Sequence, residues 1–175
     1  MTNKYSKIAI TLHWVIALLI FANFYLASAA EDLPREAQGA FMAPHKAIGI
    51  SILTLSLLRL FWRIGHKPPP LPSAIPAWQA GLGKFVHMLF YFMIIAVPFS
   101  GWLMASAHPQ APPVDFFGLF DATLPIGKSK DLAGIGHEVH EILTKPLFVL
   151  ILLHIIGALK HQFADRLPFI QRMWP

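Results

Sequence analysis

Residues 140–161 read HEILTKPLFVLILLHIIGALKH, an apolar stretch with a histidine at each end and a third, His154, inside it. An α-helix turns by about 100° per residue. His154 therefore lies within roughly 40° of His140 around the helix axis, and His161 within roughly 40° of His154, so that the three histidines share one stripe. His140 and His154 are then about 21 Å apart along the helix axis. The stretch predicts a membrane helix that carries histidine at two depths.

The rest of the chain has the composition of a membrane protein. Hydrophobic residues make up 55% of the 175 residues, charged residues only 13%, and the mean hydropathy is +0.55. Four apolar stretches each approach the roughly 20 residues that cross a bilayer. We predict an all-α integral membrane four-helix bundle, a single domain over residues 1–175, with helices at about 8–30, 45–64, 85–107 and 140–163.

The connections differ in character. Residues 65–76 carry five prolines and predict an irregular interfacial loop. Residues 108–136 predict the longest loop, in which the short patch from Phe116 to Phe120 is the only apolar segment. The pattern assigns no role to that loop.

The distribution of basic residues predicts cytoplasmic N- and C-termini. Cytoplasmic loops of membrane proteins are enriched in Lys and Arg. With this orientation nine of the 14 basic residues lie inside: Lys4, Lys7, Arg59, Arg63, Lys67, Lys84, Lys160, Arg166 and Arg172. The net charge of +5 is thereby explained by topology, and the basic residues form no aromatic-interleaved stripe of the kind that binds nucleic acid.

An alternative interpretation of the first stretch is a cleaved signal peptide. Lys4 and Lys7 precede the apolar run, and Ala27-Ser28-Ala29 resembles a cleavage site. The apolar run exceeds the usual length of about 7–15 residues in such peptides and contains His13. We therefore expect a retained helix.

The histidines are the candidate cofactor ligands. The chain contains no cysteine, which excludes thiolate ligands, and ionisable groups inside a bilayer are costly unless they are paired or ligated. Pairing by depth places His45 with His140 in an outer layer and His13 with His154 in an inner layer. Two imidazoles from different helices are what a b-type haem iron requires. Because His161 shares the stripe of His154, either could be the inner ligand, and other metals that imidazole binds are a further alternative.

Other residues have weaker assignments. His87 and His161, near the inner boundary, are candidates for binding or protonating a quinone head group. Arg59 and Arg63 could pair with haem propionates or a quinone carbonyl, or could simply be positive-inside anchors. We interpret His66, His108 and His137 as structural or interfacial residues.

Several motifs together resemble the bacterial cytochrome b-561 family along nearly the whole chain. They are His13-Trp14, His45 with Gly49-Ile50-Ser51-Ile52-Leu53, Arg59 with Arg63, His87 ahead of Tyr91 and Pro98, His140-Glu141, His154, His161 and the tail Arg172-Met173-Trp174-Pro175. The resemblance implies a dihaem protein of the bacterial inner membrane, with His45 and His140 on one haem and His13 and His154 on the other. Some members look like superoxide:ubiquinone oxidoreductases, and basic residues near the outer haem would attract the superoxide anion, here Lys46, Lys128, Lys130 and Lys145.

Three functions follow as hypotheses. The first is an oxidoreductase with two haem b groups that moves electrons from superoxide, or another small periplasmic reductant, to ubiquinone. The second is a membrane-anchor cytochrome that relays electrons from a protein redox partner such as a hydrogenase or formate dehydrogenase to quinone. The third is a non-redox membrane protein, such as a histidine-using transporter.

Overall fold

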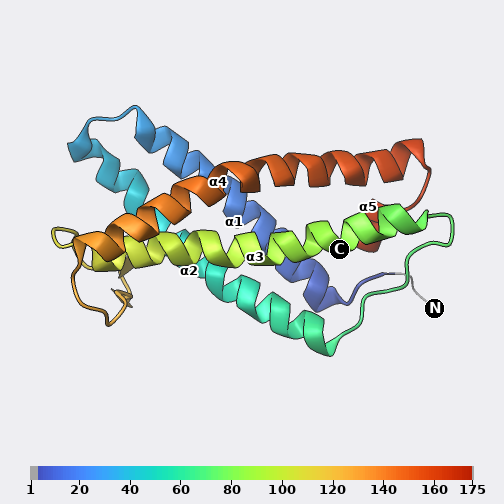
Figure 1. The fold of residues 1–175 in the computed structure, drawn as a ribbon, viewed down its shortest axis with the longest axis horizontal. Helices are drawn as coiled ribbons and strands as arrows, with labels where there is room; N and C mark the ends of the chain where they lie inside the picture. Colours follow the sequence, from blue (N-terminus) through green and yellow to red (C-terminus); the bar gives the residue numbers. More distant parts are fainter. Residues whose placement is uncertain (1–3, 175) are drawn as a thin grey trace.

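Four long helices dominate the computed structural model, which describes residues 4–174 (Figure 1). They are α1 (Lys7–Glu31), α2 (Arg35–Gly65), α3 (Ala77–Ala107) and α4 (Lys130–Leu159), and each is long and apolar enough to cross a membrane. The smaller elements are the strands β1 (Asp115–Phe116) and β2 (Phe120–Asp121), the π-helix η1 (Lys160–Ala164) and the helix α5 (Phe169–Arg172). The predicted all-α membrane four-helix bundle is confirmed. The predicted domain limits at Met1 and Pro175, and the final Pro175 of the tail motif, lie outside the described residues.

The helices begin where local sequence chemistry favours a start. The Ser6 hydroxyl accepts a hydrogen bond from the amide of Ala9 at the start of α1, and the Ser129 hydroxyl accepts one from Leu132 at the start of α4. α2 and α3 begin directly after Pro34 and Pro76. The proline-rich connection between α2 and α3 has no regular structure, as predicted.

Three helix starts differ from the prediction. α1 agrees within one residue at each end, but α2, α3 and α4 begin at Arg35, Ala77 and Lys130, about eight to ten residues before the predicted 45, 85 and 140. Hydropathy marks only the part of a helix that lies in hydrocarbon, whereas backbone hydrogen bonding continues through polar sequence. The predicted 108–136 loop is correspondingly shorter and ends at Ser129.

The packing of the bundle is uneven. α1 packs along α2, α2 along α3, and α3 along α4, with a buried cluster of Met93, Ile94, Val97, Leu147 and Ile151 between α3 and α4. Within residues 4–174, no Cα atom of α4 lies within 8 Å of α1 or of α2. Helices in ordinary contact have axes only about 8–10 Å apart. Wide gaps, bridged by side chains, therefore separate α4 from α1 and from α2.

Both chain ends lie at the same end of the bundle, which we call the inner end. The amide of Tyr5 donates to the carbonyl of Arg172 (3.1 Å), and the indole of Trp14 donates to the carbonyl of Met173 (2.6 Å). The buried guanidinium of Arg172 donates to the carbonyls of Pro69 and Pro70 in the proline-rich loop (2.9 and 2.7 Å). The predicted common side of the termini is confirmed, and the assignment of that side to the cytoplasm stays a prediction.

Candidate functional site

The predicted outer pair meets across the gap between α2 and α4. The rings of His45 and His140 have centroids 6.3 Å apart and planes at 81°. His45 Nδ1 lies 3.1 Å from the carbonyl oxygen of Asn23, and His140 Nδ1 lies 2.9 Å from that of Val97. Because a carbonyl can only accept, each Nδ1 donates and each Nε2 keeps its lone pair. This is the arrangement typical of histidines that bind a metal through Nε2.

A glycine provides the space for His140. A Cβ atom placed on Gly101 of α3 would lie 2.9 Å from His140 Nδ1 and 3.0 Å from Cε1. The imidazole therefore lies directly on the backbone of α3, where only glycine leaves room. Sequence reasoning missed this role of Gly101, because a glycine within an apolar helix does not indicate which side chain of another helix packs against it.

Gly136, in contrast, serves helix packing. Its Cβ would lie 2.8 Å from the amide nitrogen of Met104 and 2.9 Å from the carbonyl oxygen of Ser100. The two backbones thus make a close approach between α3 and α4, as small residues permit in membrane helices.

The inner layer is a cluster of three histidines from three helices. His13 of α1 and His154 of α4 have ring centroids 6.2 Å apart with planes at 71°. His87 of α3 lies 6.1 Å from the same His154 ring with planes at 85°, and its Nδ1 donates to the carbonyl of Gly83 at 2.6 Å. Within residues 4–174, the rings of His13 and His154 have no hydrogen-bond partner. His87, expected near a quinone, is thus a ring neighbour of His154, one member of the predicted ligand pair.

Two arginines of α2 lie near this cluster. Arg59 of α2 acts electrostatically on His13, His87 and His154. Arg63, one turn further along α2, acts on His87, and its buried Nη1 atom has no hydrogen-bond partner among the described residues. An unpaired buried guanidinium nitrogen is costly and marks a place where an acceptor is expected.

His161 faces away from the inner cluster. Its Nδ1 donates to Asp165 Oδ2 at 2.7 Å, and its ring stacks on Phe169 at 4.8 Å. The chain widens into the π-helix η1 at Lys160, which changes the angle per residue and breaks the stripe predicted from α-helical periodicity. The structure therefore brings His154, and not His161, to the other two histidines. The Lys160 ammonium, and then His161, hold the pKa of the Asp165 carboxyl below its ordinary value.

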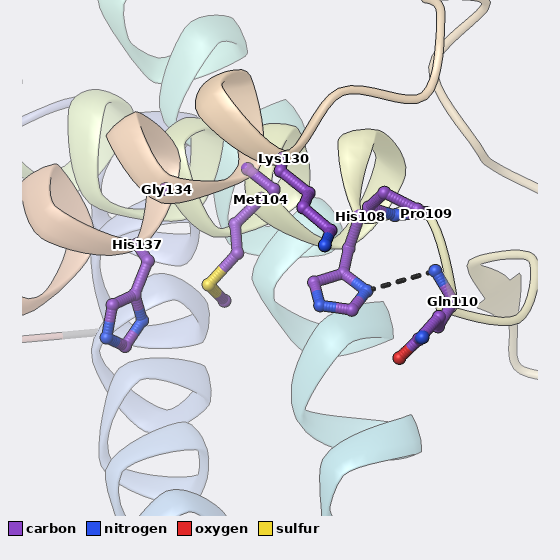
Figure 2. Close-up of a pocket in the computed structure, with 8 residues that line it drawn as sticks. Met104, His108, Pro109, Gln110, Lys130, Gly134 and His137 are labelled. Carbon is purple, nitrogen blue, oxygen red and sulfur yellow. Dashed lines mark hydrogen bonds between the residues drawn. The ribbon is translucent and has the colours of Figure 1, made fainter.

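The three remaining histidines lie outside both sites. His66 stacks on Trp62 with centroids 3.7 Å apart and its Nδ1 donates to the Trp62 carbonyl. Figure 2 shows His108 and His137 on opposite sides of an outer hollow, with Met104 and Lys130 between them. Their exposed positions agree with the interfacial interpretation.

The comparison with known proteins agrees with this geometry. The family described as prokaryotic cytochrome b561 matches residues 4–175. The chain belongs to the prokaryotic cytochrome b561 family. Cytochrome b561 homolog 2 of Escherichia coli (strain K12) is 30% identical over 174 residues, which cover 98% of this chain and 91% of that protein. The probable superoxide oxidase CybB of Yersinia pestis is 27% identical over 177 residues, covering 100% and 98%.

Membership in the cytochrome b561 family confirms the coarser functional predictions. The protein is a multi-pass protein of the bacterial inner membrane with a redox role in electron transfer, and its cofactor is haem b. The hypothesis of a non-redox transporter is wrong.

Proposed function

We propose that this cytochrome b561 binds two haem b groups and transfers electrons from superoxide at its outer end to ubiquinone at its inner end. The observation that carries the proposal is the pair of facing imidazoles at each of two depths of α4, each pair spanning a wide gap between helices. When bound, haem b supplies a one-electron iron couple. The remaining steps depend on residues of this chain.

The ring separations fit an iron between each pair. A bond from a metal to an imidazole nitrogen is about 2 Å long. That nitrogen lies about 1.1 Å from the centroid of a five-membered ring with bonds of about 1.33 Å. Two imidazoles that would hold one metal ion between them should therefore have centroids about 6 Å apart. His13 and His154 are at 6.2 Å, and His45 and His140 at 6.3 Å.

The gaps in the helix packing favour His13 over His87 as the second inner ligand. The ring centroid of His87 is about as far from that of His154 as the centroid of His13 is. However, α3, which carries His87, packs directly against α4, whereas no Cα atom of α1 lies within 8 Å of a Cα atom of α4 in the described chain. A flat macrocycle needs lateral room around the iron. We assign His13 and His154 to the inner haem, and Arg63 to a haem propionate, because guanidinium groups bind carboxylates well.

Superoxide is the electron donor favoured by the outer surface. The Yersinia pestis relative is named a probable superoxide oxidase. Lys46 follows the outer ligand His45 and acts on it electrostatically. Lys145 is paired with Glu141 at 3.3 Å, and Lys128 donates to the Ser106 carbonyl at 3.1 Å. We therefore assign Lys46, the residue next to His45, to attract an anion toward the outer pair.

Ubiquinone reduction belongs at the inner end. Two superoxide anions lose one electron each and become O₂, while one quinone takes up two electrons and two protons and becomes quinol. His161 and His87 are the proposed proton donors, and Arg59 the proposed partner of a quinone carbonyl. The Asp165 carboxylate accepts a hydrogen bond from Nδ1 of His161, so a proton for the head group would come from Nε2 of the doubly protonated imidazolium form.

The first test is the haem content of the purified protein. Reduced-minus-oxidised spectra and haem per polypeptide should show two haems in the wild type and one in each of His45→Ala and His154→Ala. The exposed His66 provides the matched control, and His66→Ala should retain both. A single haem in the wild type would contradict the proposal.

The second test addresses the substrates. Superoxide generated in the presence of a soluble ubiquinone should yield quinol, and Lys46→Gln should slow haem reduction several-fold at low ionic strength. Lys145→Gln is the matched control, because its charge is already compensated by Glu141. A dihaem protein that is not reduced by superoxide, but copurifies with a large redox partner, would instead support the anchor-subunit hypothesis.

A further inference from the structure

The loop between α3 and α4 contains a feature that electron transfer does not use. Strands β1 and β2 pair in antiparallel register, Asp115 with Asp121 and Phe116 with Phe120, and form what we call the aromatic hairpin, residues 115–121. The side chains of Phe117, Leu119 and Phe120 at its tip are 52%, 75% and 57% exposed. This is the apolar patch to which the sequence assigned no role.

The hairpin has a defined turn. The amide of Leu119 donates to the carbonyl of Phe116 at 3.0 Å, and Asp115 Oδ2 accepts from the amide of Gly118 at 2.7 Å. Phe117 and Gly118, the two central residues of the β-turn from Phe116 to Leu119, both have positive φ, 53° and 73°, as a type I′ turn requires. Positive φ is unfavourable for a bulky residue such as Phe117. The structure thus holds an aromatic ring at the tip at a cost in backbone conformation.

The base of the hairpin is tied to the outer end of α3. The indole of Trp102 donates to the carbonyl of Ala122 (2.7 Å), and the amide of Leu124 donates to the hydroxyl of Ser106 (3.1 Å). Val114, just before β1, is buried, with 1% of its surface exposed. The height of the hairpin is therefore set by the membrane-spanning helices. β1 lies against α2, and in Figure 1 the loop between α3 and α4 extends beside the outer end of the bundle.

We propose that the aromatic hairpin is a lipid anchor, whose tip (Phe117, Leu119 and Phe120) inserts into the outer leaflet of the membrane that the bundle crosses. Aromatic side chains are favoured where headgroups meet acyl chains, which is the level reached by the ends of the spans. Asp115 and Asp121 are paired at the base of the hairpin, where the Asp115 carboxylate reaches forward to accept from the Gly118 amide, and the tip residues themselves carry no charged side chain. This division matches an apolar tip in lipid and a polar base in water.

The size of the tip favours lipid over a protein partner. Three partly exposed side chains present only a few hundred Å² of apolar surface. A standard protein interface needs about 800 Å² on each partner. A lipid surface has no such minimum, because each buried apolar group contributes independently.

The base of the hairpin is built to stay ionised. Thr123 donates to Asp121 Oδ1 through its hydroxyl (2.5 Å) and its amide (2.8 Å). These two hydrogen bonds hold the pKa of the Asp121 carboxyl below its ordinary value. A permanently charged residue next to Phe120 keeps the base of the hairpin at the aqueous side and limits the depth of insertion.

Site-directed spin labelling tests the proposal on the full-length holoprotein. Because the natural chain has no cysteine, Leu119→Cys provides a unique attachment site, and Gln110→Cys, exposed in the same loop, is the matched control. In phosphatidylcholine nanodiscs, the nitroxide at position 119 should be accessible to oxygen and protected from a water-soluble nickel chelate. Its oxygen-to-nickel accessibility ratio should exceed that at position 110 several-fold.

Two outcomes would overturn the lipid anchor. Equal nickel accessibility at the two positions would place the tip in water. Protection at position 119 that appears only at high protein-to-lipid ratio would show that a second copy of the chain covers the tip. An unchanged haem spectrum in both labelled variants confirms that the bundle is intact.

Discussion

The outer pair and the inner cluster hold their imidazoles in different ways. His45 and His140 each donate Nδ1 to a backbone carbonyl, and the His140 ring rests on Gly101. His13 and His154 have no such hydrogen bonds within residues 4–174, but a third imidazole, His87, and two arginines stand around them. The outer site is therefore oriented by the backbone, whereas the inner site is shaped by charge and by neighbouring side chains.

This contrast between the outer and the inner histidine site matches their proposed roles in electron transfer. A backbone carbonyl fixes the tautomer and direction of an imidazole without adding net charge. Buried guanidinium groups stabilise added negative charge, such as a propionate, a reduced haem or a quinone being reduced. The arrangement suits an outer site that receives electrons and an inner site that passes them to an acceptor.

The largest effect should come from separating the two candidate partners of His154. We expect His13→Ala to lose the inner haem and retain the outer one, whereas His87→Ala retains both, because α1 stands apart from α4 while α3 packs directly against it. Haem per polypeptide and the spectrum of the reduced protein distinguish the variants. Loss of a haem from His87→Ala, with full occupancy in His13→Ala, would reverse the assignment.

A smaller effect is expected at the outer site from Gly101→Ala. The added methyl group would meet His140 Nδ1 at 2.9 Å and displace the ring, at a cost of about 1–3 kcal/mol. This corresponds to about a 5- to 150-fold weaker outer haem. Gly134→Ala is the control, since nothing lies within 4 Å of its Cβ position. Haem retention during detergent dilution measures the difference, and equal retention in the two variants would argue against the contact.

The smallest effect should be a change of potential at the inner site. Arg63→Gln removes a half-buried positive charge, so we expect the midpoint potential of the inner haem to fall by an amount on the order of tens of millivolts. The outer haem, about 21 Å away along α4, should change much less. Arg166→Gln, exposed at the same end, is the control. Redox titration of both haems measures the shifts, and an equal shift at both sites would contradict a local role for Arg63.

Sequence patterns were sufficient for the elements that depend on hydropathy and period. The bounds of α1, the four membrane-spanning helices and the common side of the termini were predicted, and the two histidine pairs came together as the depths indicated. The helix starts at Arg35, Ala77 and Lys130 were missed, because a helix that leaves the hydrocarbon has no hydropathic signal. The change to a π-helix at Lys160, which turns His161 toward Asp165, was missed because it breaks the period on which the prediction relied.

The sequence by itself determined that this chain crosses a membrane and carries histidine at two depths, because both properties follow from the hydropathy and the spacing of residues along single helices. Only the tertiary structure decided what each histidine meets. The contact of His140 with Gly101, the approach of His87 to His154 and the gaps beside α4 all depend on how separate helices rotate and lean against one another. These contacts are set by packing between segments that are far apart in the sequence, and a local sequence pattern does not contain that information.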